Sequence, residues 1–321
     1  MRQGSGLDLE ATEMGIRASM HGVGAVVLEK LLNSDLGGYQ GARVKCAAGH
    51  EASFVDYRIK EVTTVVGPVR IRRAYYHCGR CRNGVLPKDE LLDIVGTSFS
   101  PGVRRLMGRV GGKESFNGGR VDLEELAGIR VKTKEVERIA EMIGEQLEAL
   151  GRSERGQAIE ARVVQLKSVP KLYISFDGTG VPVTKRETEG RHGKSESGEA
   201  RTREAKLGCA FTQTSVDEKG RPVRDQASTS YVGAIESAEE FGWRIYGEAV
   251  RRGLRRAQQV IVIGDGALWI WGIAEEHFPG ATQIVDLYHA REHLAGLSKI
   301  VYGIENGKAK QWSRERIAEL D

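Results

Sequence analysis

Metal-binding side chains occur as two close pairs near the start of the chain. Cys46 and His50 are separated by three residues, and Cys78 and Cys81 by two. Zinc in proteins is usually held tetrahedrally by thiolate and imidazole groups, and two such pairs flanking a β element form a zinc ribbon. We therefore predict a structural zinc ion held by Cys46, His50, Cys78 and Cys81, with no open coordination position.

Two other interpretations of these residues stay open. Cys46 and His50 could be incidental neighbours, with Cys78 and Cys81 in an ordinary surface turn. His77 could also replace His50 as the imidazole ligand. A Cys-x2-Cys pair in a reducing compartment is more typical of a metal or redox site than of a disulfide, which favours the zinc interpretation.

Two aspartates each follow an apolar segment that has the character of a buried strand. Asp177 ends LYISFD and Asp265 ends VIVIGD, and each precedes a glycine. Asp-Gly is also a common turn sequence, so one such aspartate alone would indicate only a turn. Two of them, at the carboxyl ends of strands, are placed where α/β sheets carry their sites. Carboxylates are the ligands that Mg²⁺ prefers, and two such ions can activate the attacking oxygen and stabilise the leaving oxygen at a phosphodiester.

The elements needed to position these residues follow from the apolar pattern. Helical spacing covers residues 8–36, alternating apolar and polar residues cover 43–77, and three short helices are expected within 98–150. From residue 171 the order is three strands, helix, strand, helix, strand, helix. We predict a multi-domain α/β protein with five parts: an N-terminal helix at 1–39, a zinc-ribbon-like β module at 40–97, a helical DNA-binding region resembling helix-turn-helix at 98–150, a linker at 151–170, and a catalytic domain at 171–321.

Four segments give the chain a specific resemblance. SFDGTGVPV, REAKLG, VIGDGALWIW and DLYHAREHL look like the catalytic region of the ISKra-four family of insertion-sequence transposases, DDE enzymes with Mutator-like relatives. The resemblance implies an RNase H-like fold with a mixed sheet and helices. In that fold Asp177 and Asp265 are the first two members of the DDE triad, and Asp286 and His289 match the Asp-x2-His motif on the next strand.

The same resemblance implies an activity and its partners. It implies Mg²⁺-dependent or Mn²⁺-dependent cleavage and strand transfer on double-stranded DNA, at terminal inverted repeats and target DNA, by a homo-oligomer. In such families the last catalytic glutamate lies well downstream, after an inserted helical domain. The late glutamates Glu292, Glu305, Glu315 and Glu319 come too soon to match it. We therefore expect a truncated or frameshifted transposase that lacks the third catalytic carboxylate.

Two alternative functions follow from these observations. A non-catalytic DNA-binding protein with a zinc module is one, because of the missing glutamate. The other is a haloacid-dehalogenase-like phosphatase, since SFDGTG and IGDG resemble its loops. Thr179 stands where that family has its second aspartate, and a strand rather than a helix is expected after Asp177, so this alternative is the weaker.

Charge and hydropathy give weaker indications. The formal charge of +4 permits binding to nucleic acid without predicting it. Possible DNA contacts are Arg191 and Lys194 in a polar loop, and Arg251, Arg252, Arg255 and Arg256 at a helix end; a solvated loop and complementation of a helix dipole are the alternatives. No apolar run approaches the roughly 18 residues of a membrane span, so we expect a cytoplasmic, nucleoid-associated protein.

Overall fold

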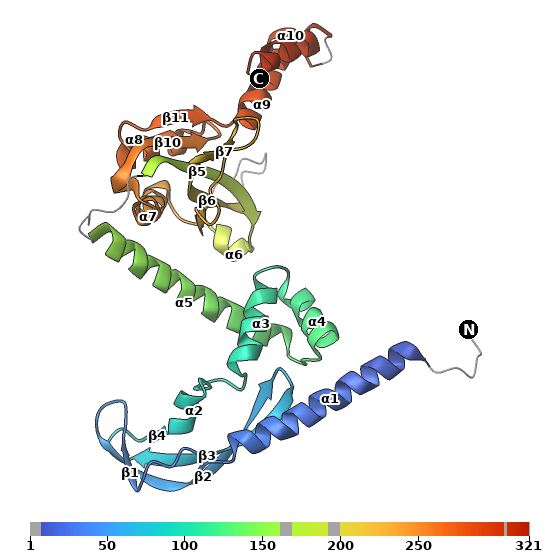
Figure 1. Ribbon diagram of the computed structural model, residues 1–321, viewed down its shortest axis with the longest axis vertical. Helices are drawn as coiled ribbons and strands as arrows, with labels where there is room; N and C mark the ends of the chain where they lie inside the picture. Colours follow the sequence, from blue (N-terminus) through green and yellow to red (C-terminus); the bar gives the residue numbers. More distant parts are fainter. Residues whose placement is uncertain (1–7, 161–168, 192–199, 305–306, 321) are drawn as a thin grey trace. The chain divides into compact units, whose positions relative to one another are not determined.

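The protein is described by a computed structural model covering residues 8–160, 169–191, 200–304 and 307–320 (Figure 1). The chain forms two compact units, Met1–Glu148 and Ala149–Asp321. Each unit combines helices with one main β-sheet, which confirms the predicted mixed α/β class. In the described part of the chain, no helix is both long enough and apolar enough to cross a bilayer.

The first unit contains a four-stranded antiparallel sheet within the predicted β module. Its long strands, β2 (Glu51–Thr64) and β3 (Gly67–Cys78), form a hairpin whose turn lies just before Gly67. Gly67 has a φ of +119°, a conformation that favours glycine. The short strands β1 (Arg43–Lys45) and β4 (Asn83–Val85) pair on either side, giving the order β1-β2-β3-β4.

One side of the C-terminal half of helix α1 (Leu9–Leu32) packs against this hairpin. Ala25, Leu28 and Leu32 contact the buried cluster formed by Val62, Val69, Ile71 and Ile94. The helix ends four residues earlier than the predicted 36. The Asn33 side chain then donates to the Arg70 carbonyl and accepts from the Arg72 amide of β3, at 2.7 and 2.8 Å. These bonds attach the end of α1 to the sheet.

A short helix follows the sheet, and after it come the three helices that the sequence predicts from residue 98 onward. Ser100 and Ser115 act as N-caps, accepting from the amides of Val103 and Gly118. Gly128 ends the second of these helices with a φ of +66°. The helices of this region are α2 (Pro87–Leu91), α3 (Pro101–Gly111), α4 (Phe116–Ala127) and α5 (Thr133–Glu160), and the core shared by α3, α4 and α5 is Phe99, Val103, Met107, Leu123, Ile129, Val136 and Ile139.

The first part of the expected linker, residues 151–160, is helical. The polarity of residues 151–160 predicts part of a connection at 151–170, but these residues form the last turns of α5. Their helix-favouring Glu, Gln, Arg and Ala residues explain the extension. Residues 161–168 lie outside the described part of the chain.

The second unit is built on a five-stranded mixed sheet with the order β11-β10-β5-β6-β9. Strands β5, β6 and β9 are antiparallel neighbours, whereas β10 and β11 run parallel to β5. The predicted order of strands and helices is therefore confirmed, with two further helices, a small hairpin and a 3-10 turn in addition. The elements are β5 (Val169–Pro182), α6 (Lys185–Thr188), β6 (Thr202–Thr212), β7 (Ser215–Val216), β8 (Pro222–Val223), β9 (Ser230–Ala234), α7 (Ala238–Arg251), a 3-10 turn (Leu254–Arg256), β10 (Ala257–Gly264), α8 (Leu268–His277), β11 (Thr282–Val285), α9 (Leu287–Tyr302) and α10 (Gly307–Ala318).

Helices α7 and α8 pack on the same face of this sheet. Phe176 of β5 lies between them, with ring centroids 6.5 Å from Phe241 of α7 and 6.4 Å from Phe278 at the end of α8. Leu172 and Ile174 point to the same core. Successive side chains of a strand point to opposite faces, so Asp177 points away from these helices.

Strand β5 is longer than predicted. The sequence predicts that Asp177 closes it, but the strand continues to Pro182, because β6 pairs with it from Leu172↔Thr212 to Pro182↔Thr202. Only the pairing with β10 stops earlier, at Ser175↔Ile263. Asp177 therefore lies beyond the parallel part of the ladder but within the antiparallel part.

Candidate metal centre and carboxylate row

Two tight turns bring the cysteine and histidine pairs together at one end of the first sheet. In the turn between β1 and β2, the Cys46 amide donates to the His50 carbonyl and the Gly49 amide to the Cys46 carbonyl, both at 2.8 Å. Gly49 has a φ of +78°, so glycine suits this turn. Because β2 and β3 are antiparallel, the start of β2 lies beside the end of β3, with Ser53 opposite His77.

The geometry of the four ligand atoms fits a zinc ion. All four lie within 4.8 Å of one another. The Cys46 and Cys81 sulfurs are 3.8 Å apart, which matches the sulfur–sulfur separation of about 3.8 Å in a tetrahedron with zinc–sulfur bonds of about 2.3 Å. His50 Nδ1 lies 3.2 Å from Cys81 Sγ. Cys46, His50, Cys78 and Cys81 could therefore bind a structural zinc ion, and His50 rather than His77 supplies the imidazole.

The cluster perturbs its own thiols. Burial raises the pKa of Cys81 to about 11, and the neighbouring Cys46 and Cys78 add to the shift through hydrogen bonds and charge. Burial also opposes ionisation of Cys46, but the amides of Ala48 and His50 and the other two thiols outweigh it and lower the pKa of Cys46. Ionised thiols at this spacing repel one another, and a divalent cation removes that repulsion.

The register of the second sheet places three aspartates at one level of adjacent parallel strands. Ser175 of β5 pairs with Ile263 of β10, two residues before Asp177 and Asp265 respectively. Gly264 of β10 pairs with Val285 of β11, one residue before Asp265 and Asp286. When each register is continued by one or two residues past its last pair, Asp177, Asp265 and Asp286 fall in a row across the three strands. We call these three residues the carboxylate row.

Each aspartate of the carboxylate row has a different local role. Asp286 is the N-cap of α9 and accepts from the amides of Tyr288 and His289, at 2.9 and 3.3 Å. Asp265 accepts from the Ala267 amide at 2.8 Å, in the turn before α8. Asp177 is exposed and accepts only from the adjacent Gly178 amide among its described contacts. Local hydrogen bonding therefore explains an aspartate at position 177 less well than at positions 265 and 286.

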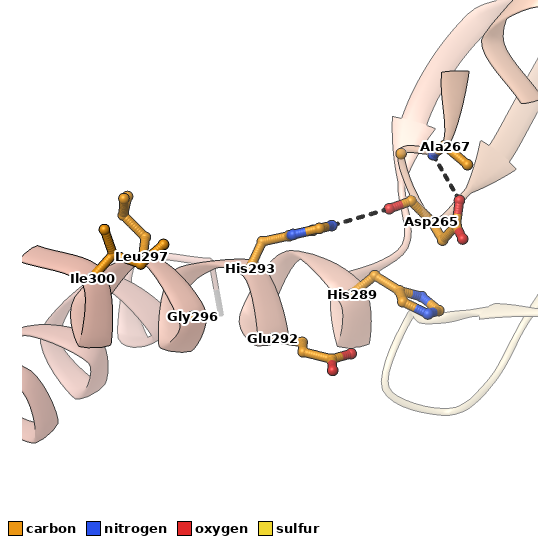
Figure 2. Close-up of a pocket in the computed structure, with 9 residues that line it drawn as sticks. Asp265, Ala267, His289, Glu292, His293, Gly296, Leu297 and Ile300 are labelled. Carbon is orange, nitrogen blue, oxygen red and sulfur yellow. Dashed lines mark hydrogen bonds between the residues drawn. The ribbon is translucent and has the colours of Figure 1, made fainter. Parts of the chain in front are cut away.

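A pocket adjoins the central member of this row (Figure 2). Asp265 lines it together with His289, Glu292 and His293 of α9, and Leu297 and Ile300 extend its apolar side. His293 Nε2 lies 3.4 Å from the Asp265 carbonyl oxygen, and His289 Nδ1 lies 3.3 Å from an Asp286 carboxylate oxygen. Asp177 and Asp286 are not among the residues lining this pocket.

The two sites differ in how closely their ligands approach. Among the described residues, only Cys46, His50, Cys78 and Cys81 bring three or more metal-binding atoms within reach of one ion. The carboxylate row aligns its members along neighbouring strands without gathering their oxygens into such a group.

The sequence comparison identifies the family. Residues 2–301 match the uncharacterised protein family UPF0236. The chain belongs to UPF0236. No curated protein matches it. The match includes both the zinc-type cluster and the carboxylate row, so this UPF0236 chain carries both candidate sites within one family region.

The arginines predicted to contact DNA are engaged within the second unit of this UPF0236 chain. Arg251 pairs with Glu154 and Glu248, at 3.0 and 2.8 Å. Arg252 donates to the Ser230 hydroxyl at 2.7 Å, and Arg255 donates to the Ile159 carbonyl. Arg256 also has partners of its own. These contacts favour a structural role for the cluster, and its contact with DNA stays a prediction.

The polar loop after β5 is only partly described. Arg191 lies at the end of the α6 turn, where its amide donates to the Thr188 carbonyl, and it lines a surface pocket with Arg186 and Arg201. Lys194 lies outside the described residues.

Two residues of the UPF0236 pocket gained no site role in the sequence analysis. Glu292 comes too soon in the chain to match the distant glutamate of the resembling family, and the motifs of that family do not include His293. The spacing His289-x2-Glu292-His293 puts all three on neighbouring positions of a helix surface, a signal that helical periodicity could have supplied.

Proposed function

We propose that this UPF0236 chain carries the phosphodiester-cleaving domain of a DDE-class DNA transposase. The observation that supports the proposal is the parallel register of β5 and β10, which sets Asp177 and Asp265 at the same level of adjacent strands. The strand that leads to the second aspartate lies beside the strand of the first, as the RNase H-like resemblance implies. The proposed RNase H-like identity of the mixed sheet rests on the same arrangement.

The carboxylates supply oxygen ligands for hard divalent cations. Bound Mg²⁺ or Mn²⁺ would supply charge stabilisation at the attacking and leaving oxygens of the DNA backbone. Asp177 and Asp265 would hold the ions on the sheet face opposite α7 and α8, away from the apolar core. In this proposal the attacking group is water in the first step and the freed 3′-hydroxyl in strand transfer, and no covalent bond to the protein forms.

Two acids beside Asp265 are candidates for the third carboxylate. Asp286 stands at the same level directly after β11, and Glu292 lines the pocket next to Asp265. Neither occupies the distant helical position that the transposase resemblance implies. Within the proposal, Asp286 is tied to the cap of α9, whereas no described hydrogen bond holds the Glu292 side chain.

The first unit fits a DNA-binding role in this proposal. Its zinc-ribbon-like sheet and the compact α3–α5 core resemble modules that position a helix on DNA. Double-stranded DNA at the ends of an insertion sequence is the proposed partner, and a nucleoid-associated location follows from it.

A second function is favoured by one observation. The carboxylate row does not gather three metal-binding groups among the described residues, whereas the cysteine–histidine cluster does. A non-catalytic, zinc-containing DNA-binding protein derived from a transposase is therefore the alternative. The phosphatase alternative is weaker still, because β5 continues past Asp177 into an antiparallel hairpin with β6 and Thr179 replaces the second aspartate.

The test measures cleavage and metal binding separately. Purified protein is incubated with a plasmid carrying the inverted repeats of its own element, with Mg²⁺ or Mn²⁺, and 3′-end cleavage is mapped. We expect Asp177→Asn and Asp265→Asn to abolish cleavage and to weaken Mn²⁺ binding by calorimetry while DNA affinity is retained. Glu218→Gln, at an exposed turn, is the matched control.

The outcomes separate the alternatives. Cleavage that survives either aspartate substitution would overturn the catalytic assignment. Specific DNA binding without cleavage in the unmodified protein would support the non-catalytic alternative. Hydrolysis of p-nitrophenyl phosphate without DNA affinity would favour the phosphatase.

A further inference from the structure

Helix α1 carries an apolar stripe that nothing in the described part of the first unit covers. None of its 24 residues is buried. Its packed side faces the β2–β3 hairpin through Ala25, Leu28 and Leu32, and Arg17 donates to the Glu125 and Leu126 carbonyls at the end of α4. In Figure 1 the N-terminal part of α1 extends beyond the hairpin. Among the described residues of the first unit, none covers the other side of the helix along its length.

The open side has the spacing of a helix–helix seam. Its large apolar residues are separated by seven, four, three, four and four positions, which keeps them within one narrow arc of an α-helix. All of them are more than half exposed: Leu9, Ile16, Met20, Val23, Val27 and Leu31. The small residues Gly15 and Ser19 form a groove beside Ile16, Met20 and Val23. A ridge and an adjacent groove on one surface allow that surface to pack against a copy of itself.

The charges on the stripe select the direction of the partner helix. Glu13 and Lys30 are exposed and fall in the same arc as the apolar residues. In an antiparallel pair centred midway between Met20 and Val23, each Glu13 lies opposite Lys30 of the second copy. The same alignment sets Ile16 opposite Val27 and Met20 opposite Val23. A parallel pair would instead place Glu13 against Glu13 and Lys30 against Lys30, which is unfavourable.

We propose that α1 is a dimerisation helix that binds α1 of a second copy of this chain in antiparallel orientation. The interface consists of Ile16, Met20, Val23 and Val27 at its centre, with Glu13 and Lys30 as ion pairs at both ends. The two-fold symmetry of such a pair makes both ends equivalent, so each dimer contains two Glu13–Lys30 pairs. This inference is independent of the proposed transposase activity.

Sedimentation velocity over a dilution series of the full chain tests the proposal. We expect the unmodified chain to dimerise and Met20→Glu to be monomeric, because the substitution buries two carboxylates at the centre of the seam. Glu13→Lys alone and Lys30→Glu alone should each raise the dimer Kd about tenfold, since each creates two like-charge pairs. The combined Glu13→Lys and Lys30→Glu protein should regain the original Kd.

The controls keep the result specific to the interface. Glu218→Lys makes the same charge change as Glu13→Lys at an exposed turn of the second unit and should leave the Kd unchanged. Zinc content and the far-ultraviolet circular dichroism spectrum establish that each variant is folded. A chain that is monomeric at every concentration overturns the proposal. So does a dimer that both single charge reversals leave unchanged, or one that the double reversal fails to restore.

Discussion

The two candidate sites of this UPF0236 chain are assembled in different ways. The cysteine–histidine cluster is made by two tight turns that fix four ligands within 4.8 Å of one another. The carboxylate row is set by strand register, which aligns Asp177, Asp265 and Asp286 without gathering their oxygens. Cysteine thiols can stay protonated and the histidine imidazole can stay neutral, so these groups tolerate close approach. Ionised carboxylates repel one another until a cation is present. The candidate zinc site is therefore largely preformed, whereas the proposed Mg²⁺ site would require its carboxylates to come closer together when the ions bind.

The two units can be observed independently, because all four tryptophans lie in the second. They are Trp243, Trp269, Trp271 and Trp312. Tryptophan fluorescence therefore reports on the unit with the carboxylate row, and bound zinc reports on the unit with the cysteine cluster. The two signals distinguish a change in one unit from a change in the other.

The largest effect is expected from removing thiolates of the zinc site. The combined change Cys78→Ser and Cys81→Ser should abolish zinc binding and unfold the β1–β4 module, because binding of a structural zinc ion supplies on the order of 10 kcal/mol. Elemental analysis and circular dichroism measure the loss. Tryptophan fluorescence should stay unchanged.

Cys209→Ser is the matched control, since Cys209 lies in β6 of the other unit. It should keep full zinc content. A double cysteine variant that retains zinc and the stability of the sheet would contradict the assignment of the cluster as a structural metal site. Cys78 and Cys81 would then belong to an ordinary turn.

A smaller effect should distinguish the members of the carboxylate row. Asp286→Ala should lower the free energy of unfolding of the second unit by about 1 kcal/mol, as expected for a lost helix N-cap. Asp177→Ala should change it little, because Asp177 is exposed and its described hydrogen bond is to the next amide. Urea denaturation followed by tryptophan fluorescence measures both. Equal losses would mean that Asp177 has a structural role that its contacts do not reveal.

The smallest effect concerns pH and the buried His277. Burial lowers the pKa of this imidazole, although the nearby Glu276 carboxylate acts in the opposite direction. The unfolded chain therefore binds a proton near its ordinary pKa of about 6.5 while the folded unit does not. Stability contributed by neutral His277 should be fully present above that pH and fall as the pH is lowered through it.

Unfolding is followed by tryptophan fluorescence at a series of pH values, from neutral pH to below the ordinary pKa of histidine, to measure this dependence. His277→Gln should show a shallower decline than the unmodified chain, because glutamine does not titrate. The ring of Trp243 lies 4.9 Å from that of His277, so the signal is local. Identical declines in both proteins would remove His277 as the cause.

The sequence predicted most of what depends on local pattern. The ligand pairs, the helices within 98–150, and the alternation of strands and helices after 171 are all local signals, and the structure contains them. The predicted length of β5 was wrong because its extension past Asp177 depends on pairing with β6, some thirty residues away. The level at which Asp177, Asp265 and Asp286 stand depends on register across three strands, which no single segment of sequence encodes.

The helical state of residues 151–160 was not predicted, for a related reason. Their polarity is typical of a connection, yet an exposed helix is equally polar, and only the continuation of α5 distinguishes the two. The pocket residue His293 could have been found from its helical spacing to His289. Its approach to the Asp265 carbonyl could not, because that contact joins residues on different elements.

The alternation of side chains along β5 has a consequence for how this region tolerates change. Phe176 and Asp177 are consecutive, one in the apolar core and one on the open face. Removing a single residue just before them would turn the acid inward to the place of Phe176, beside Phe241 and Phe278, and expel the aromatic ring. A point substitution in this strand alters one side chain, but a change in its length by one residue would invert every position that follows the change, whereas a change by two would leave each side chain on its own face.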